Sequence, residues 1–283
     1  MNGEGGDSGG PRWTRRLGFG VLAAGLVLVV AIGAFLFLLS RVSSRSVTLD
    51  EAAEQLEGQE PSAEADAGKV PFRPEEGVYS YRGEGTERLD KPPTNQEQGP
   101  QIPGTVTHLE DGCWSLRVDY NTNHWQSWEY CPTGQGLNEM RGEFFQRLDL
   151  VVAEVDTSSN YECEQPAPAL DLESRPGDQW RHECSGTSSG TDGEVISAGP
   201  YSFEGVATLV IGGEQVEALH YRRLRNLSEG QTGTEDTEIW FHPESGLPLR
   251  NQRDIEVRSG SLVGAVTYSE QGNFELTSLI PAR

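Results

Sequence analysis

The sequence predicts a mainly β protein with a transmembrane helix near its amino end, and three observations support this fold class. The 283 residues include 34 Gly and 16 Pro but only 35% hydrophobic residues, a composition typical of a turn-rich β domain. From residue 70 onward, aromatic and β-branched residues alternate with polar ones, as in half-buried strands. Residues 17–39 form one uncharged apolar run. We therefore expect an N-terminal transmembrane helix and one extracytoplasmic antiparallel β domain, a curved sheet or half-barrel with a few short helices.

The apolar run is long enough to cross a membrane. At 1.5 Å per residue a helix over residues 17–39 extends roughly 34 Å, more than the ~30 Å hydrocarbon core. It divides the chain into a cytoplasmic tail (1–16), the transmembrane helix (17–39), an acidic juxtamembrane spacer (40–69) and the β domain (70–283). A signal peptide cleaved after Ser43 or Ser44 is the alternative, although its apolar region is normally ~7–15 residues long.

The cysteines set the orientation, because arginines flank the apolar run on both sides. Cys113, Cys131, Cys163 and Cys184 contain no CxxC pair. Their spacing predicts the disulfides Cys113–Cys131 and Cys163–Cys184, which suit an oxidising compartment. The expected localisation is the cell membrane, single-pass, with the amino terminus cytoplasmic and the carboxyl domain outside.

Charge excludes one class of partner. The net charge is −22, and the first 45 residues are basic, with five Arg against Glu4 and Asp7. The acidic excess therefore lies in the carboxyl domain, which would repel nucleic acid and anionic lipid headgroups.

Local signals give the elements in order. Thr48 or Asp50 can cap a short helix that runs through Leu56 and ends before Pro61. Candidate strands follow at 77–82, 105–108, 113–120, 125–131, 144–155, 178–185, 201–211, 215–224, 234–242, 247–257, 262–268 and 273–279. Gly212-Gly213 predicts a two-residue hairpin turn, and Gly246 can close the turn in FHPESGLP. The Pro-rich segment 91–104 is expected to be a long loop.

Two serine motifs resemble enzyme signatures without their structural context. GDSGGP at residues 6–11 resembles the catalytic stretch of trypsin-like proteases, but Ser8 has seven residues before it and the apolar run shortly after. GTSSG at 186–190 matches the nucleophile elbow, yet no helix signal follows it. We therefore expect a flexible tail and a Ser/Gly loop, respectively, and no enzyme.

Two further motifs could bind metal. DYNTNH at 119–124 copies half of a calcium loop, but His124 stands where Gly is needed and Tyr130 where Glu is needed. We interpret it as a hairpin tip. His182 and Cys184 offer two ligands with no third at short spacing. No metal, catalytic residue or cofactor is predicted.

Aromatic residues supply the candidate binding site. Alternation places Trp240 and His242 on one face of a strand, and Ile239 and Phe241 on the other. These aromatics are either core with an exposed neighbour, or part of a concave face that holds an apolar ligand. Under the second interpretation the ligand-binding residues are Trp240, Phe241, His242 and Leu247. In the apolar run, Gly20 and Ala24 make a small-xxx-small spacing that would allow a dimer.

The carboxyl part, from TEIWFHPESGLPLRNQRDIEV to VTYSEQGNFELTSLIP, resembles a recurring ending in bacterial envelope proteins of the lipoprotein-carrier type. In that family a strand ends in an aromatic-x-Asp-Pro-x-x-Gly-Leu-Pro turn, and an antiparallel half-barrel wraps a hydrophobic cavity. Pro243, Gly246, Leu247 and Pro248 match the turn, while His242 replaces its acidic residue. The whole ectodomain also resembles actinobacterial single-pass membrane proteins.

The expected function follows from this resemblance. It implies a membrane-anchored, non-catalytic domain that binds a lipid or other apolar envelope molecule. The alternative is a protein-interaction or sensor module of the envelope with no small-molecule ligand, whose partners would be other envelope proteins. Only the lipid binder requires an apolar cavity of ~300–1,000 Å³.

Overall fold

The computed structural model describes residues 44–58, 71–91, 93–150, 153–261 and 264–282. The predicted cytoplasmic tail and transmembrane helix lie outside these ranges. Within the ranges, no helix is both long and apolar enough to cross a bilayer. The described segments all belong to one compact unit, Val42–Arg283.

A short helix, α2 (Leu49–Glu57), comes before fourteen strands in the described chain. The strands are β1 (Gly77–Asp90), β2 (Pro93–Gln98), β3 (Gln101–His108), β4 (Trp114–Asn121), β5 (His124–Pro132), β6 (Gly136–Leu150), β7 (Ala153–Cys163), β8 (Pro168–Asp171), β9 (Gln179–Ser188), β10 (Glu194–Ile211), β11 (Glu214–Glu229), β12 (Gln231–Phe241), β13 (Pro248–Ser261) and β14 (Gly264–Leu276). A 3₁₀ turn (Glu110–Gly112) separates β3 from β4.

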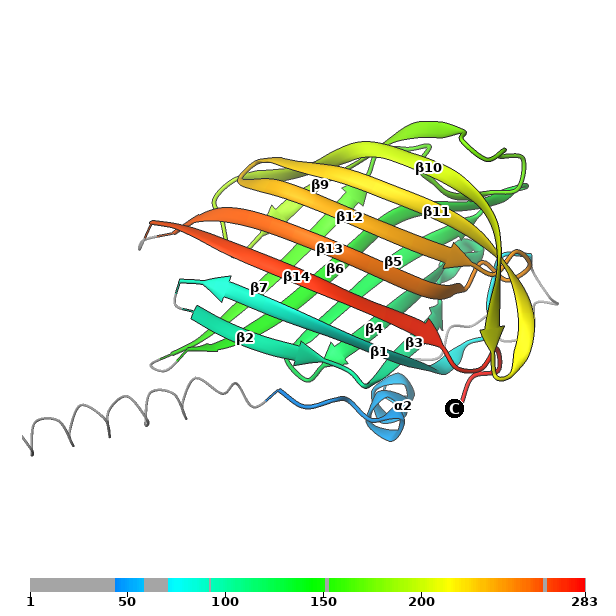
Figure 1. The fold of residues 1–283 in the computed structure, drawn as a ribbon, viewed down its shortest axis with the longest axis horizontal. Coiled ribbons are helices and arrows are strands. Elements are labelled where there is room, and N and C mark those ends of the chain that lie inside the picture. The colour runs from blue at the N-terminus through cyan, green and yellow to red at the C-terminus, as the bar shows by residue number, and fades with distance from the viewer. Residues whose placement is uncertain (1–43, 59–70, 92, 151–152, 262–263, 283) are drawn as a thin grey trace, which may run out of the picture. The chain divides into compact units, whose positions relative to one another are not determined.

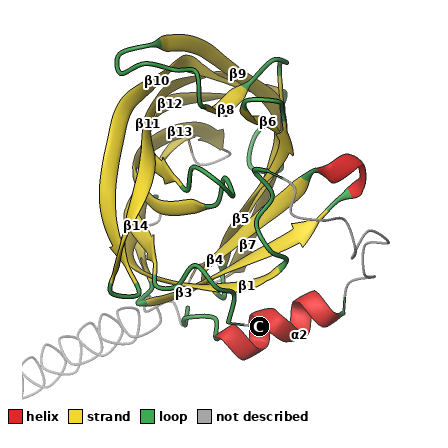
Figure 2. Cartoon of the chain, turned by 90° about the vertical axis from the view of Figure 1, so that its right-hand side faces the viewer, coloured by secondary structure: helices red, strands yellow, loops and turns green. Residues whose placement is uncertain are grey.

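The sheet closes on itself because β14 pairs with β1. This antiparallel ladder runs from Tyr81↔Leu276 to Leu89↔Tyr268. Twelve of the described strands form the ring, in the order β1-β3-β4-β5-β6-β7-β9-β10-β11-β12-β13-β14, while β2 pairs with β1 and β8 with β6. Figures 1 and 2 show the ring from the side and along its axis. The antiparallel β prediction is confirmed. The curved sheet or half-barrel is corrected to a closed barrel, in which β1 and β14 satisfy each other's backbone edges.

The segment expected as a long loop, 91–104, instead forms β2 and the start of β3. Both strands pair with β1, β2 along Gly85–Asp90 and β3 along Gly77–Arg82. The inward side chains of β2 are Thr94, Gln96 and Gln98. These polar residues alternate with exposed ones, so a search for apolar alternation misses the strand.

The predicted turns are confirmed. Gly212 and Gly213 join β10 to β11 with φ of 62° and 90°, and Gly246 has φ of 72° in the turn between β12 and β13, conformations that glycine adopts readily. β4 ends at Asn121 and β5 begins at His124, so DYNTNH forms a hairpin tip. The predicted GTSSG loop is wrong for residues 186–188, which lie in β9.

One end of the barrel is filled by aromatic and aliphatic side chains, and we call it the closed end. Its fully buried members include Tyr79, Tyr81, Ile102, Trp114, Leu116, Tyr201, Tyr221, Phe241, Leu249 and Phe274. The polar atoms of its rings have partners: the Tyr81 hydroxyl donates to the Pro248 carbonyl at 2.9 Å, and Trp114 Nε1 donates to the Phe72 carbonyl at 2.8 Å. Aromatic burial with satisfied polar tips makes this end a solid core.

The helix expected after residue 48 is present as α2. Thr48 is its N-cap and forms a capping box with Glu51, which satisfies backbone donors at the helix start. Ala52 and Ala53 pack against Val78 of β1. Figure 2 shows α2 outside the ring, beside β1 and β3.

Both predicted disulfides are confirmed. Cys113–Cys131 joins the loop before β4 to β5, and Cys163–Cys184 joins β7 to β9. Each bond joins neighbouring segments of the wall, so neither bridges the interior, and each restricts the unfolded chain.

Candidate ligand cavity

The inward side chains change in character along the barrel axis. On β11, Tyr221 lies in the closed end, Arg223 and Arg225 come next, and Leu227 follows. These four residues are two positions apart, so they share the inner face of the strand. The barrel interior thus contains the aromatic closed end, a layer of buried charged and polar groups, which we call the polar layer, and an open half beyond it.

The open half contains a cavity of about 510 Å³. Aliphatic side chains from seven strands line its wall: Leu89, Leu148, Val155, Val195, Leu227, Ile255, Val257 and Val266. Lys91, Gly190 and Gln231, which lie beside the ends of β1, β9 and β12, also line it. The polar layer forms its floor, through residues that include Tyr161, Arg223, Arg225 and Glu270. The cavity therefore combines an apolar wall with a polar base.

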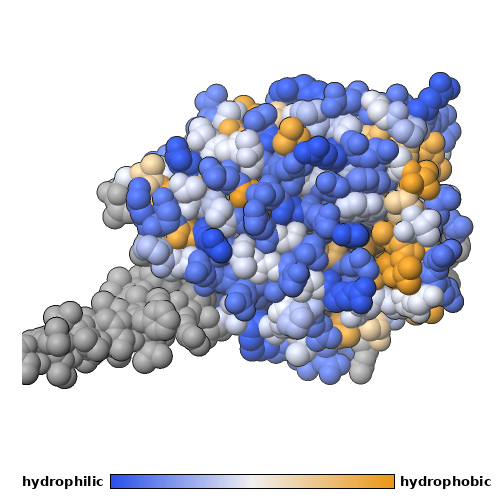
Figure 3. Space-filling model, in the orientation of Figure 1, coloured by the Kyte–Doolittle hydropathy of each residue, from blue (hydrophilic) through white to orange (hydrophobic). Residues whose placement is uncertain are grey.

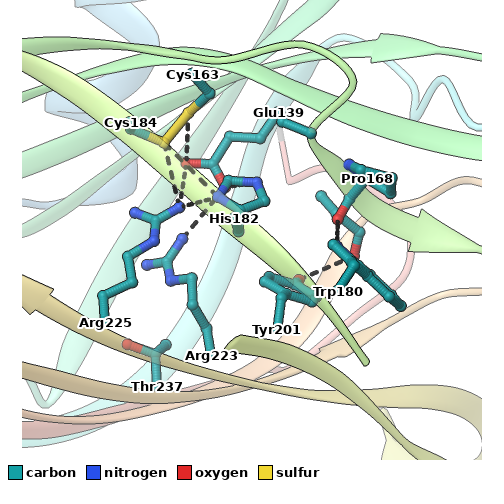
Figure 4. A network of polar contacts seen from close by, with 12 residues as sticks. Glu139, Cys163, Pro168, Trp180, His182, Cys184, Tyr201, Arg223, Arg225 and Thr237 are labelled. Atoms are coloured by element: carbon teal, nitrogen blue, oxygen red, sulfur yellow. Dashed lines mark hydrogen bonds and ion pairs between the residues drawn. A yellow bond between two sulfur atoms is a disulfide. The ribbon is translucent and has the colours of Figure 1, made fainter. Parts of the chain in front are cut away.

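One part of the polar layer is centred on Glu139, which is 1% exposed. Arg223 Nη1 donates to Glu139 Oε2 at 3.2 Å, and Arg225 Nη2 lies 3.5 Å from Glu139 Oε1. Arg225 also donates to His182 Nδ1 at 2.7 Å, and Arg223 to Glu235 Oε1 at 2.5 Å. Figure 4 shows how the two arginines converge on Glu139, His182 and the Cys163–Cys184 bond. Each buried charge has an opposite charge beside it, as burial requires.

These contacts set the protonation states. Burial alone would raise the pKa of Glu139, but the facing Arg225 and Arg223 guanidinium groups lower it to about 2. Burial lowers the pKa of His182 to about 4, against the opposing pull of Glu139. Glu139 is therefore ionised and His182 neutral near pH 7, which agrees with His182 Nδ1 accepting the hydrogen bond from Arg225.

The other part of the polar layer joins Arg253, Glu270, Glu87 and His124. Arg253 pairs with Glu270, and His124 Nδ1 lies 2.7 Å from Glu87 Oε1. The Gln98 amide bridges the two carboxylates, donating to Glu87 Oε1 at 2.8 Å and to Glu270 Oε1 at 2.7 Å. The same amide lies against Gly85 and Gly272. A Cβ added at Gly85 would lie 2.3 Å from Gln98 Oε1, and one added at Gly272 would lie 2.6 Å from it. The two glycines leave room for this amide.

Neither grouping of ligand-type residues in the described chain favours a metal. In the first, Cys163 and Cys184 stand beside His182, but both sulfurs are in a disulfide and offer no thiolate. In the second, Glu87 and Glu270 stand beside His124. Their carboxylate oxygens already accept hydrogen bonds from Gln98, Gln146 and Tyr268. This arrangement is a hydrogen-bonded network.

The four residues predicted to bind a ligand lie elsewhere, and none lines the cavity. Phe241 and Leu247 are buried in the closed end. Trp240 lies on the other face of β12, stacked on His220 with ring centroids 4.2 Å apart. The His242 ring lies in the following turn, with Nδ1 2.9 Å from Ser245 Oγ. The predicted alternation of β12 is confirmed, but these side chains are not brought together around the cavity.

Sequence reasoning missed the residues that do line the cavity, although β11 carried a signal. The segment YRRLRNL places Arg223 and Arg225 on the same face as Tyr221, at a two-residue period. A charged residue on the apolar face of a strand indicates a paired buried charge or a polar site.

A second hollow, of about 720 Å³, is lined mainly by outward residues of the wall and reaches Gln98 and Arg253 of the polar layer. It is lined by polar residues, among them Glu84, Glu97, Asp236, Glu238 and Asp254. Figure 3 shows the same polar character over much of this face of the molecule, with apolar side chains gathered toward the closed end. An acidic outer hollow does not suit an apolar chain, so the inner cavity is the better ligand site.

Comparisons with known proteins give distant likenesses only. No family model matches the chain, and no curated protein matches its sequence. Among solved structures it is similar to YmcC of Escherichia coli (K12), described as a hypothetical lipoprotein, with 11% identity and a TM-score of 0.33 over 81% of this chain and 97% of that one. It is also similar to a protein of Parabacteroides distasonis described as a lipoprotein, with 13% identity and a TM-score of 0.32 over 75% and 99% of the two chains. Both TM-scores are below 0.5, so the likeness assigns neither a family nor a function.

Proposed function

We propose that this protein binds a lipid or other apolar envelope molecule inside the open half of its barrel, without catalysing a reaction. The observation that carries the proposal is the cavity wall. Aliphatic side chains from seven strands face one space of about 510 Å³, within the range of typical ligand sites. Burying an apolar chain against such a wall is favourable by about 25 cal/mol per Å² removed from water.

We also propose that the barrel lies outside the cytoplasm. Residues 17–39 would anchor it as a single-pass protein, as in the actinobacterial membrane proteins that the sequence resembles, with the barrel outside the cytoplasm. The two disulfides support an oxidising compartment. A tethered barrel of this kind would hold its ligand at the membrane surface.

Photolabelling of the full chain tests the proposal. The chain is reconstituted in lipid nanodiscs with a long-chain hydrocarbon probe that carries a diazirine, and labelled peptides are mapped by mass spectrometry. We expect label on inward residues of β7, β11 and β13. Val257→Trp, which fills the cavity, should abolish this label. Glu256→Trp, on the outer face of the same strand, should leave it unchanged.

Two results would contradict the proposal. If the wild-type cavity residues carry no label, or if Val257→Trp keeps it, the barrel does not hold an apolar ligand there. The protein-interaction or sensor role would then replace lipid binding.

A further inference from the structure

The buried polar atoms at the cavity point to the kind of head group that a ligand carries. Among the described residues that line the cavity, four buried side-chain atoms have no hydrogen-bond partner: Arg223 Nε, Arg225 Nε, the Tyr161 hydroxyl and Ser197 Oγ. All four can donate a hydrogen bond, and the two guanidinium Nε–H groups can only donate. No carboxylate oxygen of the lining is among the unpartnered buried atoms.

Three of these donors belong to one region of the floor. Arg223 and Arg225 are 3% and 2% exposed and lie two positions apart on β11. The Tyr161 side chain lines the same cavity and packs against Cys163 and Cys184. Arg225 Nη2 lies 3.4 Å from Cys184 Sγ. Because a buried donor without an acceptor is unfavourable, this region favours any ligand atom that accepts hydrogen bonds.

The acceptors nearby are already used, which makes a donating or cationic head group a poor fit. Glu235 Oε1 accepts hydrogen bonds from Arg223 and Thr237, and Glu270 accepts from Gln98 and Tyr268. A cationic head at this floor would meet two guanidinium groups while displacing existing ion pairs. A carboxylate or phosphate would instead meet planar, permanently charged donors whose geometry matches it.

We infer that the cavity takes an amphiphile whose oxygen-bearing, hydrogen-bond-accepting head group points at Tyr161, Arg223 and Arg225, with its apolar chain along the aliphatic wall. This inference rests on the proposed function and specifies its ligand class. The accepting oxygen belongs either to the carboxylate of a fatty acid or to the phosphate of a single-chain lipid.

Tyr161→Phe is the variant that isolates this interaction. The Tyr161 hydroxyl has no partner in the protein, so its removal should leave the fold intact. Loss of one hydrogen bond to a charged head group should raise the dissociation constant of the ligand about tenfold. Tyr201→Phe is the matched control, because the Tyr201 hydroxyl donates to the Ala169 carbonyl at 2.9 Å and Tyr201 does not line the cavity.

The experiment uses the full chain in phosphatidylcholine nanodiscs and three diazirine probes of one chain length, ending in a carboxylate, a phosphate or a trimethylammonium. For each probe the label on cavity peptides of the variant is divided by that of the wild type, so that partition into the nanodisc cancels. We expect Tyr161→Phe to reduce carboxylate or phosphate labelling about tenfold and to leave trimethylammonium labelling unchanged. Tyr201→Phe should change none of the three.

The outcomes separate the two proposals. Cavity label from all three probes with no head-group-dependent effect of Tyr161→Phe would overturn the head-group inference and leave lipid binding standing. A reduction of trimethylammonium labelling by Tyr161→Phe that exceeds its reduction of both anionic probes would also overturn it. Absence of cavity label from every probe would remove the proposed function itself. The anionic probe whose labelling falls more in Tyr161→Phe shows whether the accepting oxygen belongs to a carboxylate or to a phosphate.

Discussion

At the scale of single residues, the polar layer is a set of buried charges that stabilise one another. Glu139 faces Arg223 and Arg225, and Arg223 also faces Glu235. Truncating one member of such a cluster leaves an unpaired buried charge, which typically costs ~3–5 kcal/mol. His182 is the member of this cluster whose protonation changes within a readily accessible pH range.

Stability should fall as pH is lowered from about 6.5 to 4, and His182 should be one cause. Burial lowers the pKa of His182 to about 4, whereas an unfolded histidine titrates near 6.5. Between these values the unfolded chain binds more protons than the folded chain, so unfolding becomes more favourable as pH falls. The contribution is about 3 kcal/mol. Urea unfolding of the full chain in detergent micelles, followed by tryptophan fluorescence, measures it.

His182→Gln should flatten this part of the profile, because glutamine can accept the bond from Arg225 but does not titrate. His220→Gln, on the outer surface beside Glu238, is the control and should keep the wild-type slope. An unchanged slope in His182→Gln would contradict the assignment. From pH 4.5 down to about 2 both chains should lose further stability, because Glu139 binds a proton in the unfolded chain while the folded carboxylate, whose pKa is about 2, stays ionised.

At the scale of elements, α2 packs against the outside of the barrel, and the segment before it is hydrogen-bonded to the barrel. Its capping box and its Ala52 and Ala53 contacts with Val78 are local. Two contacts fix the segment before it: the Thr122 amide donates to the Arg45 carbonyl at 2.9 Å, and Ser46 Oγ donates to the Gly99 carbonyl at 2.6 Å. The chain is thus tied to the barrel wall before β1 begins.

Ala52→Glu should detach α2 without unfolding the barrel. Ala52 is 0% exposed, so a carboxylate there would be buried without a partner. Gln55→Glu adds the same charge on the exposed side of the helix and is the control. We expect faster amide exchange in residues 49–57 of Ala52→Glu alone, with the strands unchanged. Equal exchange in the two variants would show that the packing against β1 does not hold the helix.

The sequence predicted those elements whose signals are local and apolar. The Gly212-Gly213 turn, the Gly246 turn and the Thr48 cap depend on a few neighbouring residues, and all three appear. β2 was missed because its inward residues, Thr94, Gln96 and Gln98, are all polar. Gln96 and Gln98 donate hydrogen bonds to Asn121 and Glu87 instead of packing in a hydrophobic core. The cavity floor was missed because its arginines pair with a residue distant in sequence, Glu139, which no local pattern reveals.

At the scale of the whole molecule, closure depends on pairing between the two ends of the β region. β1 and β14 are separated by almost the whole barrel sequence, and no local pattern predicts that they meet. Their inward side chains do meet: Tyr81 and Phe274 form an edge-to-face pair with ring centroids 5.1 Å apart. A half-barrel and a closed barrel have the same alternation, so this distinction required the structure.

Hydrogen exchange should show that the barrel opens as one unit. Because β14 is paired on both sides, by β13 and β1, its amides can exchange freely only when a whole ladder is lost. We expect residues 268–276 and 81–89 to exchange together, at the rate of the most protected strands. Rapid exchange of residues 81–89 and 268–276, with β10 and β11 still protected, would instead identify the β1–β14 ladder as a weak seam.

The solid aromatic end has a kinetic consequence for a bound molecule. Because aromatic side chains fill one end and the polar layer forms the floor of the cavity, the cavity opens at one end only. An amphiphile with its head at the floor would enter head first and leave tail first, through the same mouth. Each replacement would then have to wait for the previous occupant to depart, so the exchange rate would be set by escape from the apolar wall and not by the concentration of the incoming molecule.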